Sequence, residues 1–304
     1  MPETPTAAPQ HPPAGALAAA AAIGVTMVLW ASAFVGIRHL GHDFTPGSLA
    51  LGRLLVGSVC LAVVALWRPW VQPTRQEWWA IAAIGALWFG IYNLALNLGE
   101  RSVDAGTAAM LLQISPVLIA VLAALFLGER FTRNLVIGLA LAFSGVVMIG
   151  FSHPGGHQAS LIGVALCVVC SIVYSVSVIL QKPMMARLPA AQLTWLACVV
   201  GAICCLPWLP SLVTDLRTAP AASIGWLVYL GAFPTAIAFT TYAYALRHMS
   251  ATGLGVTTYI VPPIAIVLGW LLLDEVPPPL AYAGGVLALV GVAIARRKGR
   301  VAAA

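Results

Sequence analysis

The chain has 304 residues, of which 61% are hydrophobic and 8% charged, with 15 Lys and Arg against 9 Asp and Glu. A soluble domain carries about 25% charged residues, so this composition excludes a soluble cytosolic enzyme. The mean hydropathy of +0.96 indicates an integral membrane protein. The net charge of +6 does not indicate nucleic-acid binding, because the basic residues are scattered singly between apolar stretches.

Apolar stretches of membrane-spanning length follow one another along the chain, and most lack an amphipathic period, as expected of helices surrounded by lipid and protein. We therefore predict an all-α integral membrane protein. Its ten transmembrane helices are expected at residues 16–37, 47–67, 78–98, 104–127, 134–151, 160–181, 191–209, 222–246, 251–273 and 280–295. Residues 1–15 are rich in Pro and Ala and have no Lys or Arg, which predicts a disordered tail rather than a signal peptide. Residues 297–304 are expected to form a basic C-terminal tail.

The positions of Lys and Arg predict the orientation, because cytoplasmic loops carry an excess of these residues. With a cytoplasmic N-terminus, the residues outside are Arg38, Arg101 and Arg217. Those inside are Arg68, Arg75, Arg130, Arg133, Lys182, Arg187, Arg247, Arg296, Arg297, Lys298 and Arg300. The first helix alone favours the opposite orientation, since Arg38 follows it. The count over the whole chain predicts that both termini are cytoplasmic.

The sequence also contains an internal repeat. When residues 105–146 are aligned with residues 251–292, thirteen of the 42 pairs are identical, including Pro116 with Pro262 and Glu129 with Glu275. The first helices of the two halves match at an offset of 144, which pairs Trp30 with Tyr174. The predicted units are therefore two five-helix repeats, 16–151 and 160–296. Copies with an odd number of spans enter the membrane in opposite senses, which predicts inverted repeats around a central cavity.

These features resemble the EamA domains of the drug/metabolite transporter superfamily. The resemblance rests on the two five-helix halves, the segment LWASAFVG, an Arg in the second helix, the mid-helix prolines, and the LGER and LDE helix ends. It covers about residues 16–296, and the chain is most similar to the YddG-type bacterial exporters of amino acids. The resemblance implies a multi-pass transporter of the bacterial inner membrane.

We therefore expect a secondary transporter that exports small metabolites, amino acids including aromatic ones, by alternating access between the repeats. Alternatives are a flippase for lipids or lipid-linked sugars and an exporter of cationic drugs. A membrane-embedded enzyme is less favoured, because no catalytic motif and no convergent titratable groups are visible. We expect no cofactor, no metal and no nucleic acid. The expected partners are a small-molecule substrate and membrane lipid, with the chain as a monomer or homodimer.

Polar and aromatic residues near mid-depth are the candidates for binding substrate. They are Trp30, Tyr92, Asn93, Gln113, Ser171, Tyr174, Tyr244, Thr258 and Tyr259. For each of them taken singly, packing in the core is the alternative. Pro116 and Pro262 each remove a backbone donor, which predicts a helix break or hinge near the bilayer centre.

Arg53 is the one charge within a predicted span. It either snorkels or pairs with a carbonyl group, which we favour, or it contacts a substrate carboxylate. The acidic residues all fall at span ends, in loops or in the tail. Since proton-coupled pumps commonly carry an ionisable relay at mid-membrane, this placement predicts transport down the substrate gradient without coupling to protons.

Overall fold

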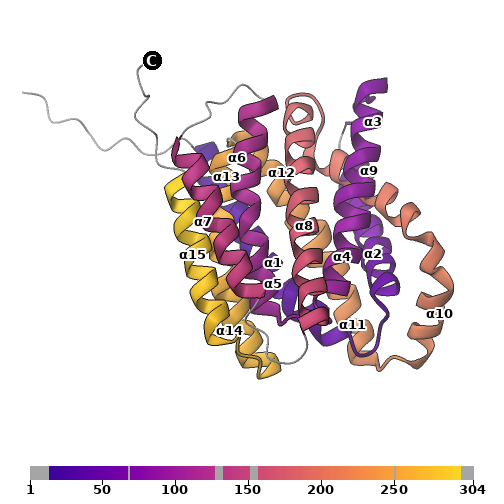
Figure 1. The fold of residues 1–304 in the computed structure, drawn as a ribbon. Helices are drawn as coiled ribbons and strands as arrows, with labels where there is room; N and C mark the ends of the chain where they lie inside the picture. The colour runs from indigo at the N-terminus through magenta and orange to yellow at the C-terminus, as the bar shows by residue number, and fades with distance from the viewer. Residues whose placement is uncertain (1–13, 68, 127–132, 151–156, 250, 296–304) are drawn as a thin grey trace, which may run out of the picture.

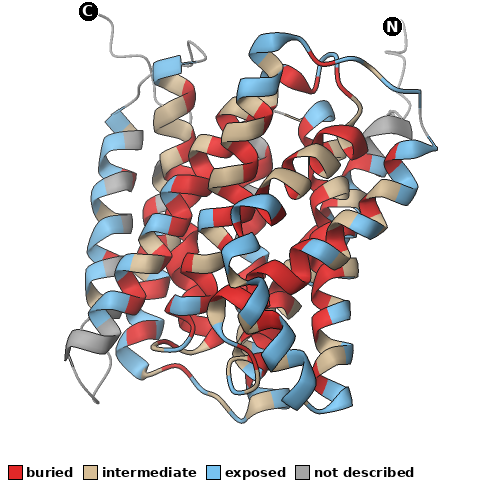
Figure 2. Ribbon diagram, turned by 90° about the vertical axis from the view of Figure 1, so that its right-hand side faces the viewer, coloured by how far each residue is buried: buried red, intermediate tan, exposed pale blue. Residues whose placement is uncertain are grey.

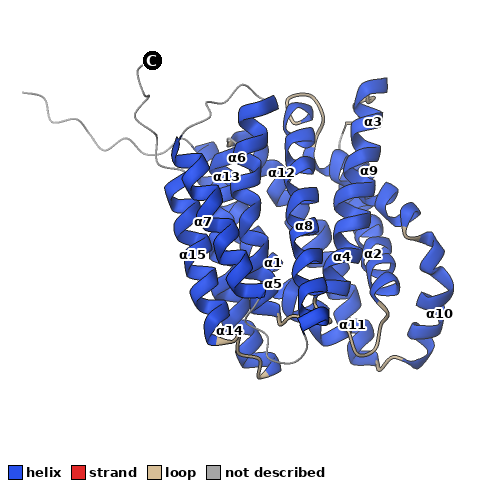
Figure 3. Ribbon diagram, in the orientation of Figure 1, coloured by secondary structure: helices blue, strands red, loops and turns tan. Residues whose placement is uncertain are grey.

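The computed structural model describes residues 14–67, 69–126, 133–150, 157–249 and 251–295. Within these ranges the chain is helical and contains no strand (Figure 3). The helices stand side by side in one bundle, with α7 and α15 together at one edge (Figure 1). The elements are α1 (Ala14–Leu40), α2 (Pro46–Leu66), α3 (Arg75–Ile84), η1 (Gly85–Ile91), α4 (Tyr92–Gly99), α5 (Ala105–Leu111), η2 (Leu112–Ile114), α6 (Ser115–Phe126), α7 (Arg133–Gly150), α8 (His157–Met184), α9 (Ala190–Cys204), η3 (Leu206–Trp208), α10 (Leu209–Thr218), α11 (Ala221–Leu230), η4 (Gly231–Ile237), α12 (Ala238–His248), α13 (Ala251–Thr257), η5 (Thr258–Ile260), α14 (Val261–Leu273) and α15 (Pro279–Ala295).

The described helices confirm an integral membrane protein. Six segments are long and apolar enough to cross a bilayer: Ala18–Leu40, Pro46–Leu66, Arg75–Gly99, Ala105–Phe126, Leu161–Met184 and Ala221–His248. A seventh crossing would combine Ala190–Cys204 with Leu206–Thr218, which meet at a bend of 54°. The shorter apolar helices are Val136–Gly145, Val261–Leu273 and Pro279–Gly291. Each stretch expected from the sequence is largely helical over its described residues, but a total of ten crossings stays a prediction.

The surface of the bundle is apolar, as a lipid-facing surface requires. Exposed positions lie on the outward faces of the helices and buried positions fill the middle (Figure 2). The outward positions include large hydrophobic side chains such as Leu66, Trp79 and Phe126, which are 65%, 71% and 72% exposed. In water such a surface would drive aggregation, whereas in a bilayer it packs against lipid chains that are also apolar.

The element boundaries repeat along the chain at the offsets seen in the sequence. The π-helical turns η1 and η4 begin at Gly85 and Gly231, 146 residues apart, and the 3-10 turns η2 and η5 begin at Leu112 and Thr258, at the same spacing. The packing repeats as well. Helix α1 packs on α12 and α14, and its counterpart α8 packs on α4 and α6.

Each irregular turn has a local cause. Pro116 and Pro262 are the second residues of α6 and α14, where a missing N–H disturbs a helix least, and the 3-10 turns η2 and η5 come immediately before them. Pro234 lies inside η4, whose wider turn accommodates it. The predicted breaks at Pro116 and Pro262 are therefore present as tightened turns in otherwise continuous helices; whether they act as hinges stays a prediction.

Glycines at the two π-helical turns allow close backbone contact. A Cβ atom on Gly85 would lie 2.6 Å from the carbonyl oxygen of Ala197 in α9, and one on Gly231 would lie 2.7 Å from that of Arg53 in α2. Helices α7 and α15 approach in the same way, since a Cβ atom on Gly145 would lie 2.4 Å from the carbonyl oxygen of Gly284. Small residues of α7 and α15 thus allow the two helices of one chain to approach closely.

Polar contacts between helices lie at both ends of the bundle. At one end, Arg38 pairs with Glu275, and Asp215 accepts a hydrogen bond from the backbone N–H of Thr45. At the other end, Arg187 pairs with Glu77. At the first end, which we call the Arg38 end, helices α1 and α4 end. At the second, which we call the Arg187 end, helix α3 begins and helix α8 ends.

Substituting Gly85 by Ala tests the close contact between η1 and α9. The added methyl group meets Val200 Cβ at 2.5 Å and a backbone oxygen, so we expect a loss of about 1–3 kcal/mol and a melting temperature lower by a few degrees. Gly225→Ala is the matched control, because nothing lies within 4 Å of its Cβ position. Thermal unfolding in detergent measures both variants, and equal melting temperatures would contradict the packing described.

Candidate functional site

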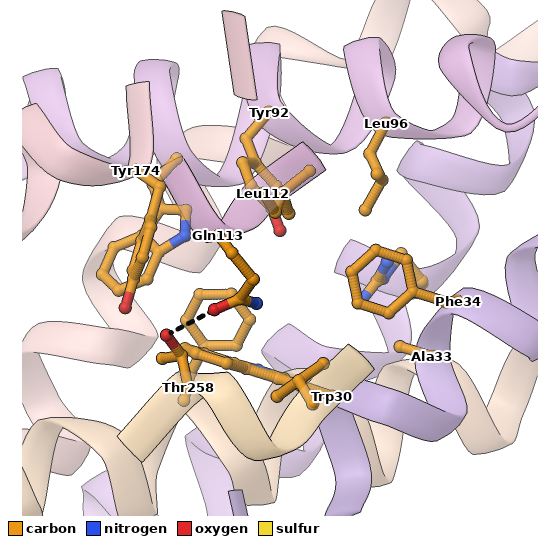
Figure 4. Close-up of a pocket in the computed structure, with 13 residues that line it drawn as sticks. Trp30, Ala33, Phe34, Tyr92, Leu96, Leu112, Gln113, Tyr174 and Thr258 are labelled. Carbon is orange, nitrogen blue, oxygen red and sulfur yellow. Dashed lines mark hydrogen bonds between the residues drawn. The ribbon is translucent and has the colours of Figure 1, made fainter. Parts of the chain in front are cut away.

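A small cavity lies at the centre of the bundle, where both halves of the chain meet. Its volume is about 50 Å³. The side chains that line it are Trp30, Ala33, Phe34, Arg53, Trp88, Tyr92, Leu96, Leu112, Gln113, Tyr174, Phe239, Thr258 and Val261 (Figure 4). They come from α1, α2, η1, α4 and η2 in the first half and from α8, α12, η5 and α14 in the second.

Aromatic rings form one wall of the cavity. The Trp30 ring lies 6.0 Å from the Tyr174 ring in an edge-to-face arrangement, and the Trp88 ring lies 5.0 Å from those of Tyr174 and Phe239. Behind them the hydroxyl groups of Tyr174 and Tyr242 are hydrogen-bonded at 2.7 Å. Such a wall offers edges and faces on which an aromatic or aliphatic side chain can pack.

Amide and hydroxyl groups come from the helix breaks. The hydroxyl group of Thr258 donates to Gln113 Oε1 at 3.2 Å, which joins η5 to η2 across the cavity (Figure 4). Gln113 Nε2 donates to the carbonyl oxygen of Ala109 at 3.3 Å. The two turns that interrupt the helices therefore place polar side chains beside the cavity, where a substrate group can exchange hydrogen bonds with them.

Arg53 supplies a positive charge at the cavity wall. It lies two turns into α2 and is 3% exposed. Its Nε atom donates to Thr235 Oγ1 at 3.1 Å. Among the described residues no carboxylate lies within ion-pair distance of its guanidinium group. A buried guanidinium group without an anion is costly, so this one is suited to receive an anionic group in the cavity.

Trp30 adds a donor close to the same space. Its ring lines the cavity, and its Nε1–H has no hydrogen-bond partner in the described part of the chain. Buried indole N–H groups usually have a partner. Together with Arg53, Trp30 gives the cavity two donors toward an acceptor, the pattern that a carboxylate group requires.

Six of the predicted binding residues line the cavity: Trp30, Arg53, Tyr92, Gln113, Tyr174 and Thr258. Asn93 does not line the cavity, and its Nδ2 atom donates to the carbonyl oxygen of Phe89 at 2.8 Å. Ser171 donates to the carbonyl oxygen of Cys167 at 3.1 Å, and Tyr244 packs on His248 with ring centres 4.4 Å apart. These three make structural contacts and do not line the cavity. The backbone of Tyr259 lies in η5, but its side chain is outside the described residues.

Sequence reasoning missed several lining residues, which are Ala33, Phe34, Trp88, Leu96, Leu112, Phe239 and Val261. Trp88 is the largest of them and has a detectable signal. It lies in the middle of a predicted span, four residues before Tyr92, and therefore on the same helical face. The apolar residues have no such signal, since any Leu, Phe or Val in a span can equally face lipid.

The cavity is contracted in this conformation. Sites for drug-sized ligands occupy about 300–1,000 Å³. A cavity of about 50 Å³ has room for a few water molecules and none for an amino acid. Binding of such a ligand therefore requires the surrounding helices to move apart.

The aromatic wall makes a testable contribution to stability. Trp88 is buried and contacts a group of neighbouring rings, so Trp88→Ala is expected to cost about 3–5 kcal/mol. Trp79→Ala is the control on the preceding turns of the same span, where the side chain is exposed, and should change stability by about 0.5 kcal/mol or less. Thermal unfolding compares the two, and similar losses would contradict the packing of Trp88.

Comparisons with known proteins agree with this arrangement. The EamA-like transporter family matches residues 17–151 and again residues 161–297. A probable terminal-alkyne amino-acid exporter of Streptantibioticus cattleyicolor is 38% identical over 277 residues, covering 91% of this chain and 93% of the relative. An uncharacterized transporter of Bacillus subtilis, YdfC, is 32% identical over 264 residues, covering 87% and 86%. A crystal structure shares the fold, with a TM-score of 0.65, 19% identity and coverage of 91% and 96%. The chain belongs to the EamA-like transporter family and is a membrane transporter.

Proposed function

We propose that the protein is a secondary transporter of the bacterial inner membrane that exports amino acids, including aromatic ones, through the central cavity. The observation that carries this proposal is Arg53, a buried guanidinium group at the cavity wall beside a cluster of aromatic rings. A charge that binds carboxylate and a wall that packs side chains are the two elements that recognition of an amino acid needs.

Arg53 is the group that selects for a carboxylate. A guanidinium group binds a carboxylate with two parallel hydrogen bonds, which are about twice as strong as bonds between neutral groups. The hydrogen bond from Arg53 Nε to the Thr235 hydroxyl group holds the side chain in place. Because the guanidinium group is planar, this bond also fixes the orientation of its two outer nitrogens. The indole N–H of Trp30 is a second donor for the same anion.

Alternating access between two inverted five-helix repeats, 16–151 and 160–296, is the mechanism we propose. The repeated element boundaries and the repeated packing of α1 and α8 support it, since equivalent halves can adopt exchanged conformations. The contracted cavity supports it too, because a site that is closed to substrate at rest must open by rearrangement. We propose ten crossings with both termini cytoplasmic, as the distribution of basic residues indicates.

Other functions fit the site less well. A cationic drug would meet the positive charge of Arg53 in a cavity where no carboxylate among the described residues lines the wall. A flippase for lipids or lipid-linked sugars needs basic contacts for a headgroup, and Arg53 is the one basic residue among those that line the cavity. An enzyme would need convergent titratable groups at one depth. The relative in Streptantibioticus cattleyicolor is named as an amino-acid exporter, which favours the same substrate class. The chain acts as a monomer or homodimer in this proposal.

Substituting Arg53 by Gln tests carboxylate recognition. In proteoliposomes we expect the concentration of an aromatic amino acid needed for half-maximal exchange to rise about 10- to 150-fold, because a hydrogen bond to a charged group of about 1.5–3 kcal/mol is lost. The corresponding amine, which lacks the carboxylate, should inhibit amino-acid exchange by the wild type only weakly. Its inhibition of exchange by the variant should be no weaker.

Two further variants control this experiment. Arg53→Lys keeps the charge without the planar fork and should give an intermediate effect. Arg217→Gln removes an exposed charge at the end of α10 and should leave exchange unchanged. If Arg53→Gln folds and exchanges amino acids with the affinity of the wild type, Arg53 does not bind the carboxylate.

Reporter fusions test the proposed orientation. A reporter that is active only outside the cytoplasm should be active when fused after Thr218 and silent when fused after Arg187. The opposite pattern would show that the Arg38 end faces the cytoplasm and would reverse the direction assigned to transport.

A further inference from the structure

Glu100 is a buried carboxyl group that the proposed substrate site does not use. It follows Gly99, the last residue of α4, and is 2% exposed. Neither of its carboxyl oxygens has a hydrogen-bond partner within the described ranges. Its backbone carbonyl oxygen accepts a hydrogen bond of 2.5 Å from Arg38 Nη1. Because a buried carboxylate requires partners, this side chain is suited to the neutral form.

Arg38 connects Glu100 to a contact between distant helices. Its Nε atom donates to Glu275 Oε1 at 2.6 Å, which joins the end of α1 to the loop after α14. Asp274 precedes this glutamate in a left-handed conformation, with φ 54°, and its N–H bonds to the carbonyl oxygen of Gly269. This turn ends α14 and directs the chain so that Glu275 meets Arg38.

A second, polar pocket lies at the Arg38 end of the bundle. Its volume is about 370 Å³ and its lining includes Arg38, His42, Asn97 and Glu100. Arg38 lies one turn after Phe34 on α1, and Glu100 lies one turn after Leu96 on α4. Phe34 and Leu96 both line the central cavity (Figure 4). The two apolar side chains therefore lie between the cavity and the polar pocket, and the ion pair lies beyond them.

The positive charges around Glu100 do not offset a negative charge on Glu100 in addition to the one on Glu275. The groups that interact electrostatically with it are Arg38, Arg53, Tyr92, Asp104, Glu275, Cys167 and Cys170. Of the two cations, Arg38 has the larger effect on Glu100, and it is already paired with Glu275. Burial, with the nearby Glu275 and Asp104 carboxylates, raises the pKa of Glu100 well above its ordinary value, against the opposing effect of Arg38.

We propose that Glu100 is a proton-binding site that controls the passage between the central cavity and the polar pocket. With the proton bound, Arg38 stays on Glu275 and the passage is closed. When the O–H bond of Glu100 breaks and the proton passes to water in the polar pocket, the carboxylate attracts the guanidinium group of Arg38. Glu275 then loses its partner, and the end of α14 is released from α1.

The repeat shows that this carboxyl group is not required by the scaffold. Lys182, the counterpart of Arg38 at an offset of 144, donates to the carbonyl oxygen of Leu246 at 2.6 Å. Leu246 lies 146 residues after Glu100, so the same backbone contact forms with a leucine in that place. The contact needs a carbonyl group alone, which leaves the Glu100 side chain free for another role. The inference rests on the proposed function.

Exchange in proteoliposomes at a series of pH values, equal on both sides, tests this proposal. The wild type should exchange amino acids faster as the pH rises, by up to about tenfold per pH unit while Glu100 carries its proton. Glu100→Gln mimics the protonated group, so its exchange should be slow and independent of pH. Glu275→Gln removes the partner that closes the passage, so its exchange should be fast and independent of pH. Glu77→Gln, at the Arg187 end of the same span, should keep the pH dependence of the wild type.

An infrared measurement keeps the test independent of transport. The C=O band of a protonated carboxyl group should be present in the purified wild type at neutral pH, decrease at high pH, and be missing from Glu100→Gln. A pH dependence that persists in folded Glu100→Gln would overturn the proposal, as would a wild type without the band. A wild type that has the titrating band but exchanges no amino acid would instead overturn the proposed function.

Discussion

The buried charge of Arg53 constrains the rest of the site. A guanidinium group inside an apolar bundle is costly unless polar groups surround it, and here Thr235 takes one of its donors. Gly231 lets η4 approach the backbone of Arg53 closely, so the π-helical turn that supplies Thr235 is itself positioned by a glycine. Arg53 lines the cavity, where in our proposal a substrate carboxylate supplies the missing anion. Binding energy for the substrate thus comes from a charge that the empty protein keeps incompletely paired.

The repeated architecture explains how such a site can open. The irregular turns η1, η2 and η5 supply residues that line the cavity, so helices are interrupted where the substrate would bind. Continuous helices satisfy their own backbone groups, whereas interrupted ones can change conformation locally. The ion pair between Arg38 and Glu275 joins α1 to the loop after α14 at one end, and Lys182 bonds to the carbonyl oxygen of Leu246 at the other end. Small changes at either end are therefore connected to the cavity through α1 and α8.

Much of the fold follows from the sequence, because bilayer-length apolar stretches and a repeated Pro–Glu–Gly pattern are strong local signals. The cavity residues were predicted where a polar or aromatic side chain lies within a span, as for Trp30 and Gln113. Asn93 and Ser171 share that signal but bond to the preceding turn of their own helix, a use that sequence position does not distinguish. Phe34 and Leu96 carry no polar signal at all. Glu100 was placed at a span end, but its burial depends on how α1, α4 and α8 pack, which no local pattern records.

We propose that an amino acid binds between Arg53 and the aromatic wall. An experimental structure of the protein in a lipid nanodisc with a bound aromatic amino acid would locate the ligand. We expect an enlarged cavity, the carboxylate within hydrogen-bonding distance of the Arg53 guanidinium group and the Trp30 indole nitrogen, and the side chain against Trp88 and Tyr174. A ligand bound elsewhere in the bundle, or one with its carboxylate turned away from Arg53, would show that Arg53 and the aromatic wall do not form the substrate site.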